Sequence, residues 1–321
     1  MSQFVGHDEA WRQFSSALEG GKLHHGWILS GPRGMGKAAF ALRAAAALVD
    51  PDDQFASMIA RGSHPDILNI KRLPKEPPKE GEDLDPDAEL KRSISIDQIR
   101  RMHASLTTRP GLADKRAVII DAADDLERNG ANALLKSLEE PPAGTYFLLI
   151  SHASDRLLPT IRSRCQLLRF EPLADEVMAL ALRQMAPGAN DADIAALVRA
   201  GNGAPGQAID FLGLDMGSLE DVMTSIIGSG DKTNELRSGL ADQLALKAAQ
   251  ARYEAFLRRA PALIADTARQ MHATEALSAT EAWQKASALA VRAVALSLDK
   301  QSVVFQMGSL LASLQPHKQA R

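Results

Sequence analysis

The sequence contains only one cysteine, Cys165, among its 321 residues. A single thiol forms no internal disulfide and supplies no cysteine-rich zinc site, so it is typical of a protein from a reducing cytoplasm. Aromatic residues are also scarce, at 4% of the chain, whereas alanine is abundant. Because alanine has the highest helix propensity of all residues, this composition favours a protein rich in helices.

The chain also lacks long apolar runs and a strong excess of either charge. No apolar stretch approaches the roughly 20 residues that span a membrane. Residues 1–8 lack the basic start and apolar centre of a signal peptide, so we expect a soluble, cytoplasmic protein with no membrane contact. A net charge of −3 argues against binding nucleic acid over the whole surface, although it allows a local basic face. The length predicts two or three domains.

A phosphate-binding loop is the clearest motif in the sequence. An apolar strand leads into a glycine-rich turn, and an alanine-rich helix over residues 38–49 follows it. Backbone N–H groups in such a turn converge on an anion, the helix adds its positive N-terminal dipole, and a lysine supplies a cation. The residues predicted to bind a nucleotide phosphate are Gly31, Gly34, Gly36 and Lys37.

Two positions near this loop lack the side chains that ATP hydrolysis needs. Ala38 stands where a working loop has the Ser or Thr hydroxyl that holds Mg²⁺. A predicted buried strand over residues 117–121 ends in Asp121, the type of residue that orients Mg²⁺ through water. The next residue is Ala122 instead of the glutamate that positions the attacking water. The strand alone also fits an ordinary core strand with a chance aspartate; beside the loop, we interpret Asp121 as vestigial.

A pair of arginines marks a second informative stretch, over residues 157–166. Arg162 and Arg164 stand two residues apart, ahead of a predicted strand. The planar guanidinium of arginine neutralises charge spread over several phosphate oxygens, so an arginine at a subunit edge can complete the nucleotide site of a neighbour. Taken alone, an Arg-Ser-Arg sequence is more often a solvated surface, and the residues themselves leave both interpretations open.

The remaining patterns divide the chain into an α/β part and a helical part. Buried strands alternate with helices over residues 1–171, which is typical of an α/β domain with a parallel sheet. Residues 71–92 contain four prolines and many charges of both signs but almost no apolar side chain, so we expect a disordered insertion. We expect three helices over residues 172–213 and a helical domain with its own core over residues 214–321.

Together these segments resemble the clamp-loader branch of the AAA+ family. The resemblance rests on residues 23–37, 132–142 and 158–165, in this order and spacing, and it weakens beyond about residue 212. It implies an AAA+ domain, a three-helix lid and an oligomerisation collar. It also implies a subunit of the bacterial DNA polymerase III holoenzyme, a DNA-directed DNA polymerase. The implied partners are the tau/gamma motor subunits and the delta subunit in a hetero-pentameric ring, with the sliding clamp and primed DNA reached through the complex.

The resemblance gives Arg164, within the motif Ser163-Arg164-Cys165, the role of an arginine finger acting in trans on ATP held by a motor subunit. Residues 203–207 lack the arginine that motor subunits carry in their lid. With the changes at positions 38 and 122, this implies a subunit that hydrolyses no ATP and requires no cofactor; passive ATP or ADP binding stays open. The family's four-cysteine zinc module has no counterpart over residues 50–62, so we expect no metal.

Two alternatives remain from the sequence. An ATP-hydrolysing motor, similar to tau/gamma or to another AAA+ ATPase, needs a hydroxyl after Lys37 and a carboxylate after Asp121, and neither is present. A pure interaction module would keep the nucleotide fold as a relic and leave Arg164 facing solvent. The coincidence of the changes at the nucleotide site favours the non-hydrolysing subunit.

Overall fold

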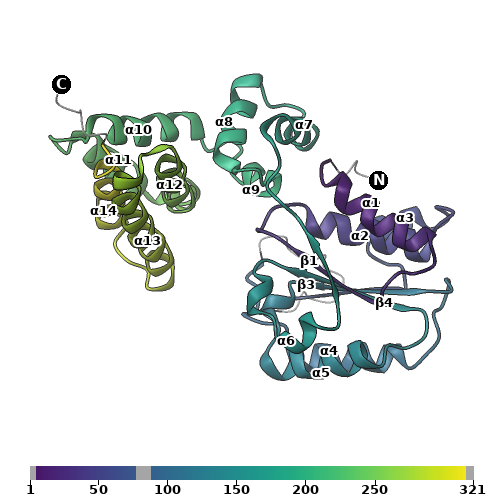
Figure 1. Cartoon of the computed structure of the whole chain (residues 1–321). Coiled ribbons are helices and arrows are strands. Elements are labelled where there is room, and N and C mark those ends of the chain that lie inside the picture. The colour runs from purple at the N-terminus through teal and green to yellow at the C-terminus, as the bar shows by residue number, and fades with distance from the viewer. Residues whose placement is uncertain (1–4, 77–87, 316–321) are drawn as a thin grey trace. The chain divides into compact units, whose positions relative to one another are not determined.

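The computed structural model describes residues 5–76 and 88–315 of the chain. These residues form two compact units (Figure 1). The first comprises the described chain up to Ala181 together with Gly203–Gly206, and the second comprises Leu182–Asn202 and the described chain from Gln207 onward. The predicted lid, residues 172–213, thus contributes to both units, and its status as a separate domain stays a prediction.

The first unit is built on a five-stranded sheet in the order β2-β3-β4-β1-β5, in which every pairing is parallel. Helices cover both faces of such a sheet, so its central strands are almost continuous apolar runs. The α/β fold with a parallel sheet that the sequence predicts is therefore confirmed. The strands are β1 (Gly26–Ser30), β2 (Ile67–Lys71), β3 (Arg116–Asp121), β4 (Thr145–Ser151) and β5 (Gln166–Arg169).

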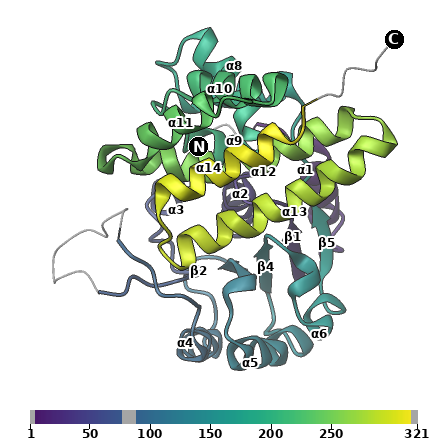
Figure 2. The same ribbon diagram turned by 90° about the vertical axis from the view of Figure 1, so that its left-hand side faces the viewer.

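Helices α1, α2 and α3 cover one face of the sheet, and α4, α5 and α6 cover the other (Figures 1 and 2). The first face has an aromatic core, in which Phe14 packs edge to face on Trp27 and Phe40 with ring centroids 5.5 and 6.0 Å apart. On the second face Ile28 and Phe147 are fully buried. The elements are α1 (Asp8–Glu19), α2 (Lys37–Val49), α3 (Ala56–Ala60), α4 (Ile96–Leu106), α5 (Arg128–Glu139) and α6 (Pro159–Arg162), with 3₁₀ turns η1 (Ala123–Asp125) and η2 (Ser154–Arg156).

The stretch 71–92, for which the composition predicts disorder, is paired at its described ends. The backbone N–H of Lys75 donates to the carbonyl of Glu89, and that of Lys91 donates to the carbonyl of Leu73, each at 2.7 Å. Antiparallel backbone hydrogen bonds order these ends without any apolar core. Residues 77–87 lie outside the described residues, so the prediction of a disordered insertion now concerns them alone.

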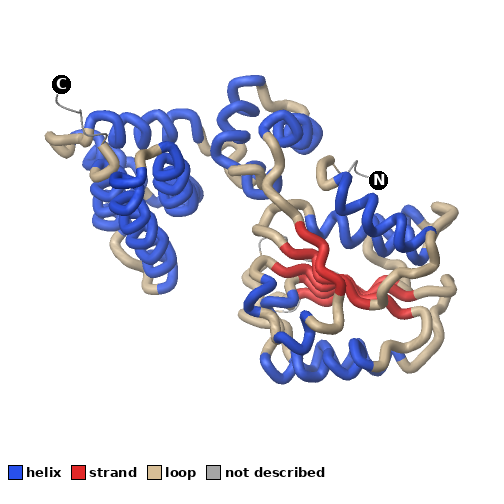
Figure 3. Tube along the Cα trace, viewed as in Figure 1, coloured by secondary structure: helices blue, strands red, loops and turns tan. Residues whose placement is uncertain are grey.

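The second unit is entirely helical in its described residues (Figure 3). Its core includes Phe256, Ile264 and Met307, which are fully buried. Arg259 is also buried, and it pairs with Glu220 and, at 3.1 Å, with Asp266. The helices are α8 (Asp191–Gly201), α10 (Met216–Ser229), α11 (Glu235–Ala245), α12 (Gln250–Gln270), α13 (Ala273–Ala295) and α14 (Lys300–Ala312), with η3 (Lys247–Ala249); α7 (Asp175–Met185) and α9 (Pro205–Ile209) belong in part to each unit.

Asp66 fixes the loop that leads into β3. Its buried carboxylate accepts hydrogen bonds from the backbone N–H groups of Gly111, Leu112 and Ala113 at 2.7–3.0 Å. The guanidinium of Arg116, at the start of β3, lies 3.6 Å from it. Burial acts to raise the pKa of Asp66, but the three N–H groups and the guanidinium lower this pKa below its ordinary value. Asp66 therefore stabilises the fold in its charged form.

We predict that Asp66→Asn lowers the free energy of unfolding by about 3 kcal/mol at neutral pH, because it removes the charge from a buried, hydrogen-bonded pair. Since the folded-state pKa is lowered, this contribution is complete above the ordinary value of 3.8 and is lost as the pH falls through the lowered value. Urea unfolding over a pH series should show the two proteins converging only below about pH 4. Asp114→Asn, an exposed acid in the same loop, is the control. A gap that stays constant with pH would contradict the assignment.

Candidate functional site

The residues predicted to bind nucleotide lie at the carboxyl edge of the sheet. The glycine-rich loop follows β1 and Asp121 ends β3, and these strands flank β4 in the order β3-β4-β1. Ligands of open α/β sheets bind at this edge, because strand ends, loops and helix N-termini meet there. Five predicted residues therefore share one edge, while their role in binding stays a prediction: Gly31, Gly34, Gly36, Lys37 and Asp121.

Three glycines of the loop are required by its backbone. Gly34 and Gly36 adopt left-handed conformations with φ of 81° and 79°, which cost other residues energy, and Gly36 caps the N-terminus of α2. At Gly31 a Cβ atom would lie 2.3 Å from the carbonyl oxygen of Phe170, so no side chain fits. The sequence thus specifies a tight turn between β1 and α2.

The ammonium group of Lys37 is bound by its own loop. Its Nζ donates to the carbonyl oxygens of Gly31 and Pro32, each at 2.6 Å, and the residue is only 3% exposed. Burial lowers the pKa of Lys37 to about 8, against the opposing effect of the Asp121 and Asp124 carboxylates. The cation that a phosphate-binding loop offers to a nucleotide is here engaged with backbone carbonyls.

Gly206, at the N-terminus of α9, also contacts this loop. Its backbone N–H donates to the carbonyl of Gly34 at 2.8 Å, and a Cβ atom at position 206 would lie 3.0 Å from Gly34 Cα. The sequence analysis considers this segment only for the arginine it lacks. Because both residues belong to the first unit, the contact closes the loop from within that unit.

Asp124 is a member of this site that sequence reasoning missed. Its carboxylate accepts from the Ser151 hydroxyl at 2.8 Å and from the backbone N–H of His152 at 2.5 Å, and so ties η1 to the end of β4. Burial and the nearby Lys37 charge lower the pKa of His152, opposed by Asp124 and Asp121. The only sequence signal was a second acid three residues after Asp121, which is too common a spacing to identify a site.

Alanine residues occupy two positions that matter for ATP hydrolysis. A hydrolysing site has a metal-binding hydroxyl at the first and a catalytic carboxylate at the second. Ala38 is exposed beside the loop, and Ala122 is buried after β3. The described residues contain no group of three His, Cys, Asp or Glu side chains that could hold a metal ion. The carboxyl edge thus has an aspartate at position 121 but lacks, at position 38, the hydroxyl that holds Mg²⁺ in a hydrolysing loop.

Arg164 lies between α6 and β5 and is partly exposed. Its side chain is 34% exposed, and its Nη2 lies 2.7 Å from Oε1 of Glu139, the last residue of α5. Nη1 donates to the carbonyl of Thr160 at 2.9 Å and to the Ser163 hydroxyl at 3.3 Å. Arg162 is exposed two residues earlier. Arg164 is thus neither buried in the core nor free of contacts with its own chain.

The sheet places Arg164 at the edge opposite to the phosphate-binding loop. β5 pairs in parallel with β1, with Trp27 opposite Gln166 and Ser30 opposite Arg169. Arg164 therefore precedes the amino end of β5, whereas the loop follows the carboxyl end of β1. At about 3.3 Å per residue, the strand separates them by roughly 17 Å. One arginine side chain does not bridge this length, so Arg164 does not serve its own chain's loop.

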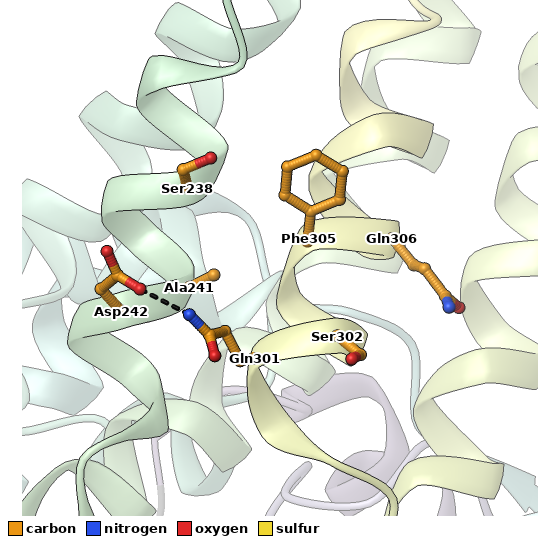
Figure 4. A pocket seen from close by; sticks show the side chains of 7 residues that line it. All are labelled: Ser238, Ala241, Asp242, Gln301, Ser302, Phe305 and Gln306. Carbon is orange, nitrogen blue, oxygen red and sulfur yellow. Dashed lines mark hydrogen bonds between the residues drawn. The ribbon is translucent and has the colours of Figure 1, made fainter.

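A separate hollow of about 380 Å³ lies between α11 and α14 in the second unit (Figure 4). Its carboxylate, on Asp242, accepts from the Gln301 amide at 2.6 Å, and the ring of Phe305 forms part of the wall. None of the seven lining residues is basic. The hollow therefore lacks the cation that binding a phosphate group would need.

The parallel sheet, with a glycine-rich loop after β1 and an aspartate at the end of β3, is an α/β fold of the AAA+ type. Comparison with known families agrees with this class and narrows it. The sequence profile of the family described as "DNA polymerase III, delta subunit" matches residues 6–174, just over half of the chain. The chain belongs to this family, so the resemblance to DNA polymerase III clamp-loader subunits is confirmed.

Two curated relatives carry the name DNA polymerase III subunit delta'. The protein from Pseudomonas aeruginosa is 36% identical over 166 residues, covering 48% of this chain and 46% of the relative. The protein from Escherichia coli is 29% identical over 203 residues, covering 60% and 56%. The chain thus spans about half the length of the curated relatives it matches.

A solved structure extends the likeness in fold to the helical part. The DNA polymerase III gamma subunit-related protein from Thermotoga maritima superposes with a TM-score of 0.50 at 16% identity, over 94% of this chain and 98% of that one. At this identity the likeness shows the fold alone. No helix in the described part of the chain combines the length and apolar character needed to cross a membrane.

We predict that the buried ammonium of Lys37 gives the fold a distinct alkaline pH dependence. Its pKa of about 8 lies below the ordinary 10.5, so between these values the unfolded chain binds more protons and stability rises with pH. Relative to Lys37→Met, the wild-type free energy of unfolding should rise by about 1.4 kcal/mol per pH unit in this window. Denaturant unfolding between pH 7 and 10.5 measures it. Lys136→Met, at an exposed lysine, is the control, and parallel curves for wild type and Lys37→Met would contradict the prediction.

Proposed function

We propose that this chain acts as the delta-prime subunit of a DNA polymerase III clamp loader, hydrolyses no ATP itself, and supplies Arg164 as an arginine finger to an adjacent motor subunit. The observation that carries the proposal is the placement of Arg164 at the sheet edge opposite to its own phosphate loop. A partly exposed guanidinium in that position is available only to an acceptor outside its own nucleotide site.

The state of the chain's own loop supports the absence of hydrolysis. The Lys37 ammonium is bound to two carbonyls of the loop, and the N–H of Gly206 donates to a third. Ala38 and Ala122 offer neither a metal ligand nor a catalytic carboxylate. A bound ATP or ADP would have to displace the lysine from its carbonyls and would do so without Mg²⁺ coordination. Such passive binding is weak and requires no cofactor.

In this function Arg164 supplies a positive charge to the nucleotide site of the neighbouring subunit. In phosphoryl transfer, negative charge spreads over the phosphoryl oxygens in the transition state, and a guanidinium placed there stabilises it more than it stabilises the bound ATP. The neighbour holds the nucleotide and metal, while this chain adds one cation across the subunit boundary. Assembly and hydrolysis are thereby coupled, because a motor without this partner lacks the cation.

The helical part supplies features that suit assembly. On α13, Leu277 and Val291 are each 70% exposed and Val294 is 67% exposed, so this helix presents apolar side chains that subunit contact would bury. We assign residues 214–321 to the collar and 172–213 to the lid. The proposed partners are the tau/gamma motor subunits and the delta subunit in a cytoplasmic hetero-pentamer, which brings the chain to the sliding clamp and primed DNA.

A second candidate function is that of an ATP-hydrolysing motor. It is favoured by relatives such as the DNA polymerase III subunit gamma of Buchnera aphidicola, 28% identical over 181 residues. Phosphate release by the isolated chain would favour the motor, because such release requires a hydrolytic site within this chain. We predict no Mg²⁺-dependent phosphate release above background in a steady-state ATPase assay of the isolated chain. Release that is abolished by Lys37→Ala would favour the motor.

We predict that Arg164→Ala lowers turnover at the adjacent motor's ATP site by on the order of 10³-fold, since an arginine finger stabilises the transition-state charge. The measurement is DNA-stimulated ATPase of a reconstituted complex in which only that motor keeps the lysine of its phosphate loop. Arg162→Ala, an exposed arginine two residues away, should turn over like the wild type. Assembly on size-exclusion chromatography should be the same for all three. Equal turnover in the Arg164 variant would remove the finger assignment.

A further inference from the structure

The guanidinium of Arg164 is held in one orientation by its own chain. Glu139 Oε1 lies 2.7 Å from Nη2, and Nη1 donates to the Thr160 carbonyl and the Ser163 hydroxyl. A guanidinium has five N–H donors. Within the described residues these contacts leave the Nε–H and one Nη2–H for an acceptor outside the chain. Glu139 is the acidic partner among the three groups.

The backbones that carry this pair are fixed to the same strand. The carbonyl of Leu138, one residue before Glu139, accepts from Nε2 of His25 at 2.9 Å. A Cβ atom at Gly26 would lie 2.9 Å from Cys165 Sγ and 3.2 Å from the Arg164 carbonyl. The end of α5 and the segment before β5 therefore both pack against the start of β1.

The position of Glu139 within its helix does not favour an acidic side chain. It is the last residue of α5, where the helix dipole disfavours a carboxylate, and the exposed Glu140 adds a second negative charge. The pair with Arg164 is also about half exposed on the Glu139 side, and exposed ion pairs contribute little to folding stability. The contact does, however, restrict a long side chain that would otherwise sample many rotamers.

From these observations we infer that Glu139 is a positioning residue for Arg164. It holds the guanidinium in the orientation that meets the neighbouring subunit's nucleotide, so that little rotamer freedom is lost when the phosphate oxygens accept the remaining N–H groups. The inference rests on the proposed function of Arg164 as an arginine finger. It adds that the carboxylate of a different element, α5, sets the finger's efficiency without touching the nucleotide.

The test uses the reconstituted complex with a single active motor, the one next to this chain. Glu139→Ala should lower kcat about tenfold, because a misplaced group loses transition-state contacts. Glu139→Gln, which keeps one acceptor oxygen, should lose less. The KM for ATP should not change, because the motor's own pocket binds the ground-state nucleotide. Glu140→Gln, at the exposed acid next in the chain, should match the wild type.

A double-mutant cycle separates positioning from a structural role. If Glu139 acts through the guanidinium, Glu139→Ala has no further effect in the Arg164→Ala background. The inference would be overturned if Glu139→Ala turned over as fast as the wild type or faster while Arg164→Ala was slow. That result would still support Arg164 as the arginine finger. An equal loss from Glu139→Ala in both backgrounds would also overturn it, since the effect would then bypass Arg164. If Arg164→Ala itself turned over like the wild type, the result would contradict the proposed role of Arg164, on which the role of Glu139 rests.

Discussion

The parallel pairing of β1 with β5 is the constraint on which the functional geometry depends. β1 lies between β4 and β5, so its carboxyl end delivers the glycine-rich loop to one edge of the sheet while its amino end packs against the segment that carries Arg164. A parallel pair fixes these two edges as opposite ends of the same strand. The loop and the arginine therefore lie at opposite edges of the sheet.

The loop keeps the backbone shape of a phosphate-binding turn while its lysine is bound within the chain. Left-handed glycines and the helix N-terminus keep the shape of the turn, because the backbone still has to pass from β1 into α2. The buried Lys37 ammonium would be costly without acceptors, and the carbonyls of Gly31 and Pro32 supply them. The ammonium group of Lys37 in this way contributes to the structure of the loop.

At the edge of the sheet opposite to the loop, the charged groups are partly exposed instead of buried. Arg164 is partly exposed and its carboxylate partner lies on a separate helix, so the pair adds little to stability but fixes the direction of a long side chain. The buried Asp66–Arg116 contact, by contrast, lies in the core and anchors a loop through backbone N–H groups. Burial is what separates the two cases, because solvent screens the first pair and not the second.

Local patterns in the sequence predicted the elements well. The helix expected over residues 38–49 is α2 (Lys37–Val49), and the strand expected over 117–121 lies within β3. These predictions succeed because apolar runs, glycines and helix periodicity act between residues that are close in the chain. The composition of residues 71–92 was less informative, since a backbone ladder at its ends needs no apolar residues.

The sequence by itself determined the sheet, the loop, the missing hydroxyl and carboxylate, and the family. Only the tertiary structure decided that Lys37 binds its own carbonyls, that Gly206 closes on Gly34, and that Glu139 holds Arg164. The last two join residues that are far apart in sequence, and the first depends on which rotamer the folded loop permits. No residue pattern encodes such contacts, because they arise only when the packed sheet brings separate segments within hydrogen-bonding distance.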